Sequence, residues 1–215
     1  MSDLLDPTID KYLDRLIPAP AAEWSAMERE GRRQGLPLID RQVGRLLELL
    51  VRTSGAARVL EIGTCIGYST AWLARAVGEN GRVLSLEIDP DRAARAREHL
   101  RAAGLIDRVE VREGDAAALI ETLEGPFDLV FNDGDKRHYP RIAARCHDLL
   151  RVGGLLVSDN ALWGGSAARA GGDADTKAIK KHNSWLMRHA DFTATLLPVR
   201  DGVLVARRND RENSR

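Results

Sequence analysis

Apolar residues change their spacing about a quarter of the way along the chain. Over the first fifty or so residues they recur at helical spacing, as in Ile9 and Leu13. Asp6 followed by Pro7 has the form of a helix cap with a first-turn proline. Helices are therefore expected from Pro7, over 21–34 and from about Asp40.

From Arg58 onward, short apolar runs alternate with helical patterns. The runs cover 59–62, 82–88, 108–113, 127–132 and 154–159, and the helical stretches lie near 69–78, 90–103, 116–123, 138–150 and 174–189. Because the runs lack polar alternation and are separated by helices, they predict a parallel sheet covered on both faces. The Asp201-Gly202 turn between the apolar runs 195–199 and 202–207 predicts a hairpin, so the sheet should end in an antiparallel pair.

The expected fold is thus a doubly wound α/β sheet in a single domain. Residues 1–54 form a helical N-terminal extension, 55–208 form the ligand-binding core and 209–215 form a tail. A chain of 215 residues with 44% hydrophobic content can fill such a core.

Charge and cysteine content exclude several function classes. The 32 basic and 32 acidic residues balance, so the whole chain exerts no net pull toward nucleic acid or a membrane surface. No apolar run approaches the roughly 20 residues that span a bilayer, and the first residues lack the layout of a signal peptide. Cys65 and Cys146 are too few for a disulfide framework. A cytoplasmic location is expected.

Open parallel sheets bind ligands beyond the carboxyl ends of their strands. The first strand ends in EIGTCIGYS, a glycine-containing turn from Glu61 to Ser69 that leads into a helix. Such a turn brings backbone amides close to a ligand, although it also serves simple close packing. Cys65 stands where a dinucleotide fingerprint requires glycine, which disfavours a nicotinamide dehydrogenase.

Acidic residues follow the second and third strands. Glu87, about 20 residues beyond the glycine turn, suits the two hydroxyls of a ribose, and Asp89 before Pro90 suits a helix cap. Asp115 could reach an adenine amino group or cap the helix that begins at Ala116, and the sequence leaves both roles open.

Polar side chains also gather where the fourth and fifth strands end. Asp133 follows one strand, and Asp159 and Asn160 follow the other. If these strands are neighbours, the three side chains form an all-oxygen set that suits a hard cation such as Mg²⁺. As an alternative, the two aspartates are solvated helix caps. Lys136 either serves the chemistry or forms an ion pair with Asp133 or Asp135.

Together, the segments EIGTCIGYS, SLEID, FNDGDKRHY and SDNALW resemble the cation-dependent O-methyltransferases, the family of catechol and caffeoyl-CoA O-methyltransferases and small bacterial relatives. The resemblance runs from about Leu36 to Arg207. It implies a class I (Rossmann-like) methyltransferase fold with a seven-stranded sheet, S-adenosylmethionine (SAM) as methyl donor and a homodimer.

The resemblance also implies roles for single residues. Glu61, Gly63, Thr64 and Ser69 would line the methionine and sulfonium part of SAM, Glu87 the ribose, Asp115 and Ala116 the adenine, and Asp135 a further cofactor contact. Asp133, Asp159 and Asn160 would hold the cation, Mg²⁺ or alternatively Mn²⁺ or Ca²⁺, and Lys136 would be the base, its pKa lowered by the dication. Gly164 replaces an asparagine with which the plant enzymes contact their substrate, so the plant substrate is not carried over.

The leading hypothesis is therefore methylation of a small catechol-like or vicinal-oxygen acceptor. Trp163 would line the acceptor pocket or simply pack, and the glycine-rich segment 164–172 would gate it. One relative in this family methylates a hydroxylated uridine in tRNA. The basic residues of 177–188 and 29–33 make tRNA an alternative acceptor, which the neutral net charge disfavours. A non-catalytic cofactor-binding module is disfavoured by the complete set of site residues.

Overall fold

The computed structural model describes residues 7–18 and 21–210 of the chain. Its N-terminal helices are α1 (Pro7–Leu16), α2 (Ala22–Gln34) and α3 (Arg41–Ser54), as the apolar spacing predicted. Asp40 caps α3, since its carboxylate accepts a hydrogen bond from the Val43 amide at 3.0 Å. The cap expected at Asp6 lies outside the described residues.

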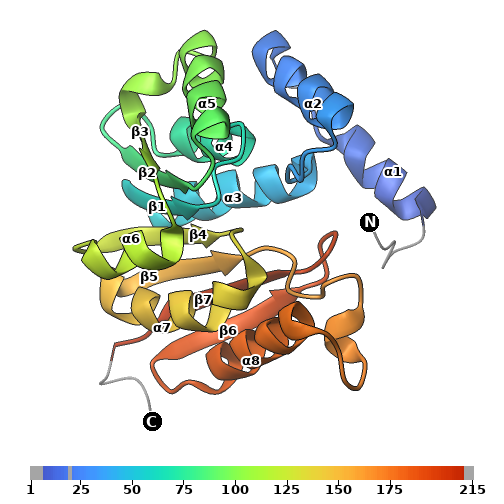
Figure 1. The fold of residues 1–215 in the computed structure, drawn as a ribbon, viewed down its shortest axis with the longest axis vertical. Coiled ribbons are helices and arrows are strands. Elements are labelled where there is room, and N and C mark those ends of the chain that lie inside the picture. The colour runs from blue at the N-terminus through green and yellow to red at the C-terminus, as the bar shows by residue number, and fades with distance from the viewer. Residues whose placement is uncertain (1–6, 19–20, 211–215) are drawn as a thin grey trace.

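A single mixed sheet forms the centre of the molecule, with strand order β3-β2-β1-β4-β5-β7-β6 (Figure 1). β1 to β5 are parallel, and β7 is antiparallel to both β5 and β6, so the predicted antiparallel ending is confirmed. The strands are β1 (Arg58–Ile62), β2 (Arg82–Glu87), β3 (Val109–Glu113), β4 (Phe127–Asn132), β5 (Leu150–Ser158), β6 (Phe192–Leu197) and β7 (Val203–Arg208).

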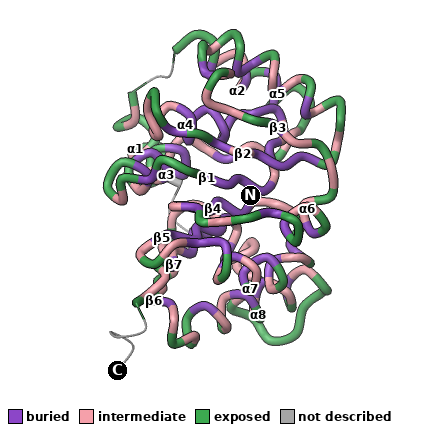
Figure 2. The backbone as a smooth tube through the Cα atoms, turned by 90° about the vertical axis from the view of Figure 1, so that its left-hand side faces the viewer, coloured by how far each residue is buried: buried purple, intermediate pink, exposed green. Residues whose placement is uncertain are grey.

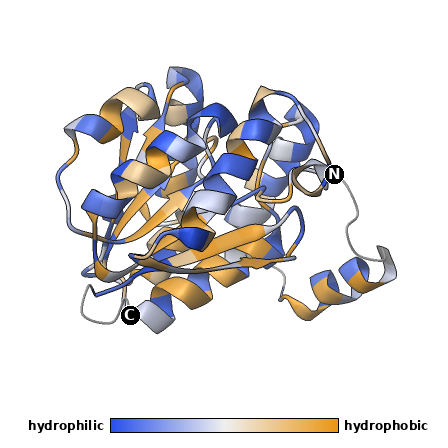
Figure 3. Cartoon of the chain, turned by 90° about the horizontal axis from the view of Figure 1, so that it is seen from below, coloured by the Kyte–Doolittle hydropathy of each residue, from blue (hydrophilic) through white to orange (hydrophobic). Residues whose placement is uncertain are grey.

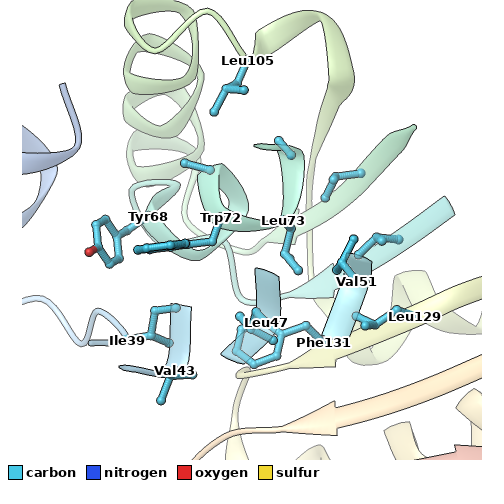
Figure 4. Close-up of a cluster of buried hydrophobic side chains, with 14 of the residues drawn as sticks. Ile39, Val43, Leu47, Val51, Tyr68, Trp72, Leu73, Leu105, Leu129 and Phe131 are labelled. Atoms are coloured by element: carbon cyan, nitrogen blue, oxygen red, sulfur yellow. The ribbon is translucent and has the colours of Figure 1, made fainter. Parts of the chain in front are cut away.

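Helices cover both faces of this sheet, as strands without polar alternation require. On one face α3, α4 (Tyr68–Ala76) and α5 (Pro90–Ala102) pack on the odd-numbered residues of the central strands, and Figure 4 shows Leu47, Trp72 and Phe131 in this core. On the other face lie α6 (Ala116–Thr122), α7 (Tyr139–Leu149) and α8 (Ala174–Arg188). Short 3₁₀ turns are η1 (Ile106–Arg108), η2 (Lys136–His138) and η3 (Ser166–Ala168). Figure 2 shows the buried residues following the central strands.

Two strands begin earlier than the sequence pattern predicts. β5 starts at Leu150 instead of 154, and its register with β4 shifts between Phe127 and Leu129, so the extra residues form an irregularity. Gly153 and Gly154 interrupt the apolar run there and hide the start of the strand. β6 covers 192–197 instead of 195–199. Within the described residues, no helix is long and apolar enough to cross a membrane.

The first helix lies to the side of the main body (Figures 1 and 3). Ile9, Tyr12 and Leu16 expose 49, 54 and 60% of their surface, so α1 presents an apolar stripe to solvent. Polar contacts hold α1 to the body, including an ion pair of 3.2 Å between Asp10 and Arg200. Neighbouring exposed apolar residues of this kind are typical of an interaction site.

Candidate active site

The turn after β1 presses against the end of β4. Gly63 has φ +97°, and a Cβ atom there would lie 2.7 Å from the backbone oxygen of Asp133. Only glycine fits this position, because both its backbone angle and its distance from Asp133 exclude a side chain. The Asp133 amide in turn donates to the oxygen of Ile62 at 2.9 Å. The predicted cofactor turn and the predicted cation corner are therefore contiguous.

Glu61 is fully buried at the carboxyl end of β1. One carboxylate oxygen accepts hydrogen bonds from Ser85, at 2.5 Å, and from Thr70, and the other oxygen has no partner. Burial raises the pKa of Glu61 to about 7, against the lowering effect of the hydroxyls of Ser69, Ser85 and Thr70. The pattern along the chain did not single out Ser85 or Thr70, because a lone hydroxyl residue in a buried strand or helix carries no distinctive spacing.

Glu87 also faces the cofactor turn. Its carboxylate accepts the amides of Cys65 at 2.7 Å and Asp89 at 3.0 Å. It therefore fixes the glycine turn in this structure, and its contact with a ribose stays a prediction. Asp89 caps α5 as predicted, accepting the amides of Asp91 and Arg92.

The side chain of Asp115 caps α6, at 2.9 Å from the Ala117 amide, which is one of its two predicted roles. Asp115 is exposed, so its contact with an adenine stays a prediction. Ile88, which the sequence pattern did not single out, is 69% exposed directly after Glu87. An exposed large apolar residue at the end of a strand is suited to the flat face of a ligand ring, and the available signal for it was an apolar residue that follows the strand.

Lys136 is the buried cation of this site. Its ammonium group donates to Asp133 Oδ1 and lies 2.8 Å from both that oxygen and the hydroxyl of Tyr139. Burial disfavours the charge on Lys136, but the nearby oxygens of Tyr139 and Asp133 prevail and raise its pKa. The ion pair considered as an alternative role is thus present. The predicted lowering of this pKa requires a neighbouring dication and stays a prediction.

Tyr139, the first residue of α7, lies next to Lys136. It is fully buried, and its hydroxyl lies 3.2 Å from the backbone oxygen of Asn132 and 3.1 Å from that of Asp159. It therefore joins Lys136 to the ends of both β4 and β5. The position of Tyr139 directly after the DKRH segment was the one sequence feature that could have indicated a role in the site. The sequence does not show, however, where the hydroxyl of a tyrosine that begins a helix points.

Asp159 lies beside Asp133, because β4 and β5 are neighbours and the Asp159 amide donates to Asn132. It is 5% exposed, and its Oδ1 atom is buried without a hydrogen-bond partner. Burial and the charge of Asp133 both raise the pKa of Asp159. Asn160 follows with φ +54°. The predicted neighbourhood of the two carboxylates is confirmed, and neither is a helix cap among the described helices.

This donor set fits a hard cation. The single charge of Lys136, which donates to Asp133, offsets one of the two carboxylates, and one oxygen of Asp159 is left without a partner. Within the described ranges, no group of three or more His, Cys, Asp or Glu side chains is placed to hold a metal ion. A cation held by the two aspartates would therefore take a further protein ligand from a neutral oxygen such as that of Asn160.

The remaining predicted residues lie around this corner. Asp135 caps η2 and pairs with Arg137 at 2.5 Å, so its cofactor contact stays a prediction. Trp163 is half-buried, and its ring centre lies 6.0 Å from the ammonium of Lys136.

An open cavity of about 380 Å³ lies between α2 and α5 and reaches Ile66 of the glycine turn.

Comparisons with known proteins agree with this geometry. The family model described as O-methyltransferase matches residues 32–209. The chain is 40% identical to a catechol O-methyltransferase of Mycobacterium tuberculosis, over 89% of this chain and 88% of that protein. It is 32% identical to a catechol O-methyltransferase of Niastella koreensis, over 92% of each chain.

Solved structures give the same result. The O-methyltransferase TomG of Streptomyces achromogenes, in complex with SAM, superposes with a TM-score of 0.88 at 32% identity, covering 94% of this chain and 96% of that one. An O-methyltransferase of Bacillus cereus, in complex with SAH, gives a TM-score of 0.86 at 30% identity, covering 94% and 97%. Since the family model, the similar sequences and the solved structures all match most of the chain, the chain belongs to the O-methyltransferase family of the catechol and caffeoyl-CoA type and is a SAM-dependent O-methyltransferase with the class I fold.

Proposed function

We propose that this enzyme transfers the methyl group of SAM to one oxygen of a small catechol-like acceptor with the help of a divalent cation. The observation that carries the proposal is the buried, unpartnered Oδ1 atom of Asp159 beside Asp133. Two carboxylates in such proximity are costly without a cation between them. The catechol O-methyltransferases among the relatives support the choice of acceptor.

Asp133, Asp159 and Asn160 would hold the cation, for which Mg²⁺ is the first choice and Mn²⁺ or Ca²⁺ are alternatives. When bound, it would lower the pKa of an acceptor hydroxyl by charge. The carboxylates are fixed for this task by their strands, since the amides of both Asp133 and Asp159 are hydrogen-bonded to the neighbouring strand.

On the donor side, the turn from Glu61 through Gly63 and Thr64 to Ser69 would hold the methionine and sulfonium part of SAM. Glu87 would hold the ribose, and Asp115, Ala116 and Ile88 would surround the adenine, with Asp135 as a further contact. The relatives solved with SAM or SAH support this donor. Because methyl transfer is an in-line displacement, fixing both reactants contributes most of the rate.

Lys136 would accept the acceptor proton. In the structure its ammonium donates to Asp133, so Lys136 must first release a proton to solvent before its amine can act as a base. The positive charge of a cation held by Asp133 would favour that release. Tyr139 keeps the Lys136 nitrogen in place through the hydroxyl at 2.8 Å.

The experiment is transfer of a labelled methyl group to simple catechols with Mg²⁺, with and without chelator. Asp159→Ala and Asp133→Ala should abolish cation-dependent turnover while SAH binding persists. Asp148→Ala is the matched control, since that carboxylate is exposed near the far end of α7. Full activity in strong chelator would refute the role of the cation.

The same assay with tRNA from cells lacking this protein tests the alternative acceptor. Exposed Arg29, Arg33, Lys177 and Lys181 would contact phosphates. Lys180, by contrast, donates to the backbone oxygens of Arg169 and Gly171 and is occupied within the chain. Label in tRNA but not in catechols would reverse the order of the two functions.

We also propose a homodimer, because the apolar stripe of α1 needs a partner surface. Light scattering should give twice the chain mass, and Tyr12→Ser with Leu16→Ser should shift it toward the monomer. A monomeric wild-type protein at micromolar concentration would refute this.

A further inference from the structure

The segment directly after Asp159 has an unusual backbone. Asn160 and Trp163 have φ values of +54° and +48°, and Gly164 and Gly165 have +60° and +79°. A non-glycine residue in this left-handed region is strained and persists only where neighbouring contacts impose it. The segment 160–165 therefore needs neighbouring contacts that hold it, here called its frame. Its two strained non-glycine residues are Asn160, proposed for the cation, and Trp163, proposed for the acceptor.

The turn between β6 and β7 supplies most of this frame. The oxygen of Gly202 accepts the Ala161 amide at 2.9 Å, and the oxygen of Asp201 accepts the Leu162 amide at 2.8 Å. The carboxylate of Asp201 accepts the Gly164 amide at 2.6 Å. Three backbone amides of the segment, those of Ala161, Leu162 and Gly164, are thus satisfied by two residues that lie about 40 positions further along the chain.

Helix α8 completes the frame from the other side. The side-chain amide of Asn183 donates to the backbone oxygen of Ala161 at 2.7 Å, and Ala161 is fully buried. The bond from Asn183 is made to Ala161, the residue after Asn160, and the bond to Asp201 is made by Gly164, the residue after Trp163. Each strained residue is therefore followed at once by a side-chain hydrogen bond that fixes its backbone.

The turn itself is anchored to the body of the protein. Arg200 forms ion pairs with Asp40, which caps α3, and with Asp10 of α1. Gly202 has φ +84°, and a Cβ atom there would lie 2.5 Å from Leu162 Cγ. The frame is therefore rigid and in direct contact with the segment it holds.

We infer that Asp201 and Asn183 are positioning residues, which hold Asn160 against the cation and Trp163 against the acceptor. The inference rests on the proposed function of this corner. Neither residue touches the reacting atoms; Asp201 acts through the Gly164 amide and Asn183 through the oxygen of Ala161. Residues that orient metal ligands in this way typically contribute about 10–100-fold in metal affinity or activity.

The test compares Asp201→Ala with Asp201→Asn, which keeps an oxygen acceptor for the Gly164 amide. Asp201→Ala should weaken Mn²⁺ binding, followed by electron paramagnetic resonance, by about 10–100-fold. It should lower kcat for catechol, speed hydrogen exchange of the Gly164 amide and leave the SAH dissociation constant within about twofold. Asp201→Asn should restore most of the Mn²⁺ affinity and the slow exchange. Asn183→Leu, which removes the donor at similar volume, should act in the same direction as Asp201→Ala.

Each outcome has a distinct meaning. Unchanged Gly164 exchange and unchanged Mn²⁺ affinity in Asp201→Ala would overturn the inference. If the wild type transfers no methyl group to catechols but Asp201→Ala still loses Mn²⁺ affinity, the proposed acceptor is wrong and the positioning role stands. If the wild type binds no Mn²⁺, the proposed cation is wrong. Faster Gly164 exchange in Asp201→Ala but not in Asp201→Asn would then still show that Asp201 holds the segment 160–165 in place. Thermal unfolding of each variant confirms that it is folded.

Discussion

Replacing Tyr68 by phenylalanine removes one hydroxyl from the junction between α2 and α4. That hydroxyl donates to Glu28 Oε1 at 2.7 Å, and Arg41 donates to both oxygens of the same carboxylate at 2.7 and 2.6 Å. Burial raises the pKa of Glu28, but the bonds from Arg41 and Tyr68 prevail, so its pKa lies below the usual range. The carboxylate therefore stabilises the fold above its unfolded-state pKa of about 4.5, and this contribution is lost as the pH falls through the lower folded-state value.

The magnitude follows from the partners that remain. A hydrogen bond to a charged group contributes about 1.5–3 kcal/mol. Tyr68→Phe leaves the Glu28 carboxylate paired, because Glu28 keeps both bonds to Arg41, so a loss of about 2 kcal/mol is expected at pH 7. For a chain of this length, 1 kcal/mol corresponds to about 2–4 °C in Tm, so Tyr68→Phe should lower Tm by about 4–8 °C.

Thermal unfolding at pH 7 measures this shift. Tyr12→Phe is the matched control, since Tyr12 is 54% exposed and its loss of a hydroxyl should leave Tm unchanged. The double variant with Glu28→Gln should lose about 1 kcal/mol less than the sum of the two single variants, because both changes remove the same bond. A Tm within 1 °C of wild type for Tyr68→Phe, or strict additivity in the double variant, would refute the reasoning.

Three further outcomes are expected. Burial lowers the pKa of His182 to about 4, so unfolding should become easier by about 3 kcal/mol as the pH falls from 6.5 to 4, and His182→Phe should flatten that part of a denaturation-against-pH curve. Gly202→Ala should cost about 1–3 kcal/mol and impair catechol methylation more than SAH binding, because the new methyl group collides with Leu162; equal losses in both would contradict this. Asp89→Ala should cost about 1 kcal/mol in urea unfolding through the lost cap of α5, and a neutral result would show that the cap is dispensable.

Much of the fold was predictable because its signals are local. Helix boundaries followed from residues such as Asp40 and Asp89, whose side chains cap the helix that follows them. The parallel sheet followed from apolar runs that lack alternation. The early start of β5 was not predictable, since Gly153 and Gly154 end the apolar signal and the bulge opposite β4 arises only from pairing.

The residues of the candidate site also include some that the sequence could predict and some that it could not. The acidic residues at strand ends could be found because parallel strands bring their carboxyl ends to one edge. The partners of those residues could not. Tyr139 contacts Lys136 because of the direction in which its side chain points. Ser85 contacts Glu61 because β1 and β2 pair in the folded sheet. Long-range hydrogen bonds of this kind leave no periodic trace in a sequence.

The sheet order also divides the chain into two continuous stretches with separate tasks. β1 lies between β2 and β4, so the chain up to Ala116, with β1 to β3, supplies every residue proposed for the base and the sugar. The cation corner, the acceptor segment and its frame all come from residue 127 onward. Gene segments encoding the later stretch can therefore diverge, or be exchanged, while the earlier one stays intact. Enzymes with a shared methyl donor and very different acceptors are the evolutionary outcome that such a division favours.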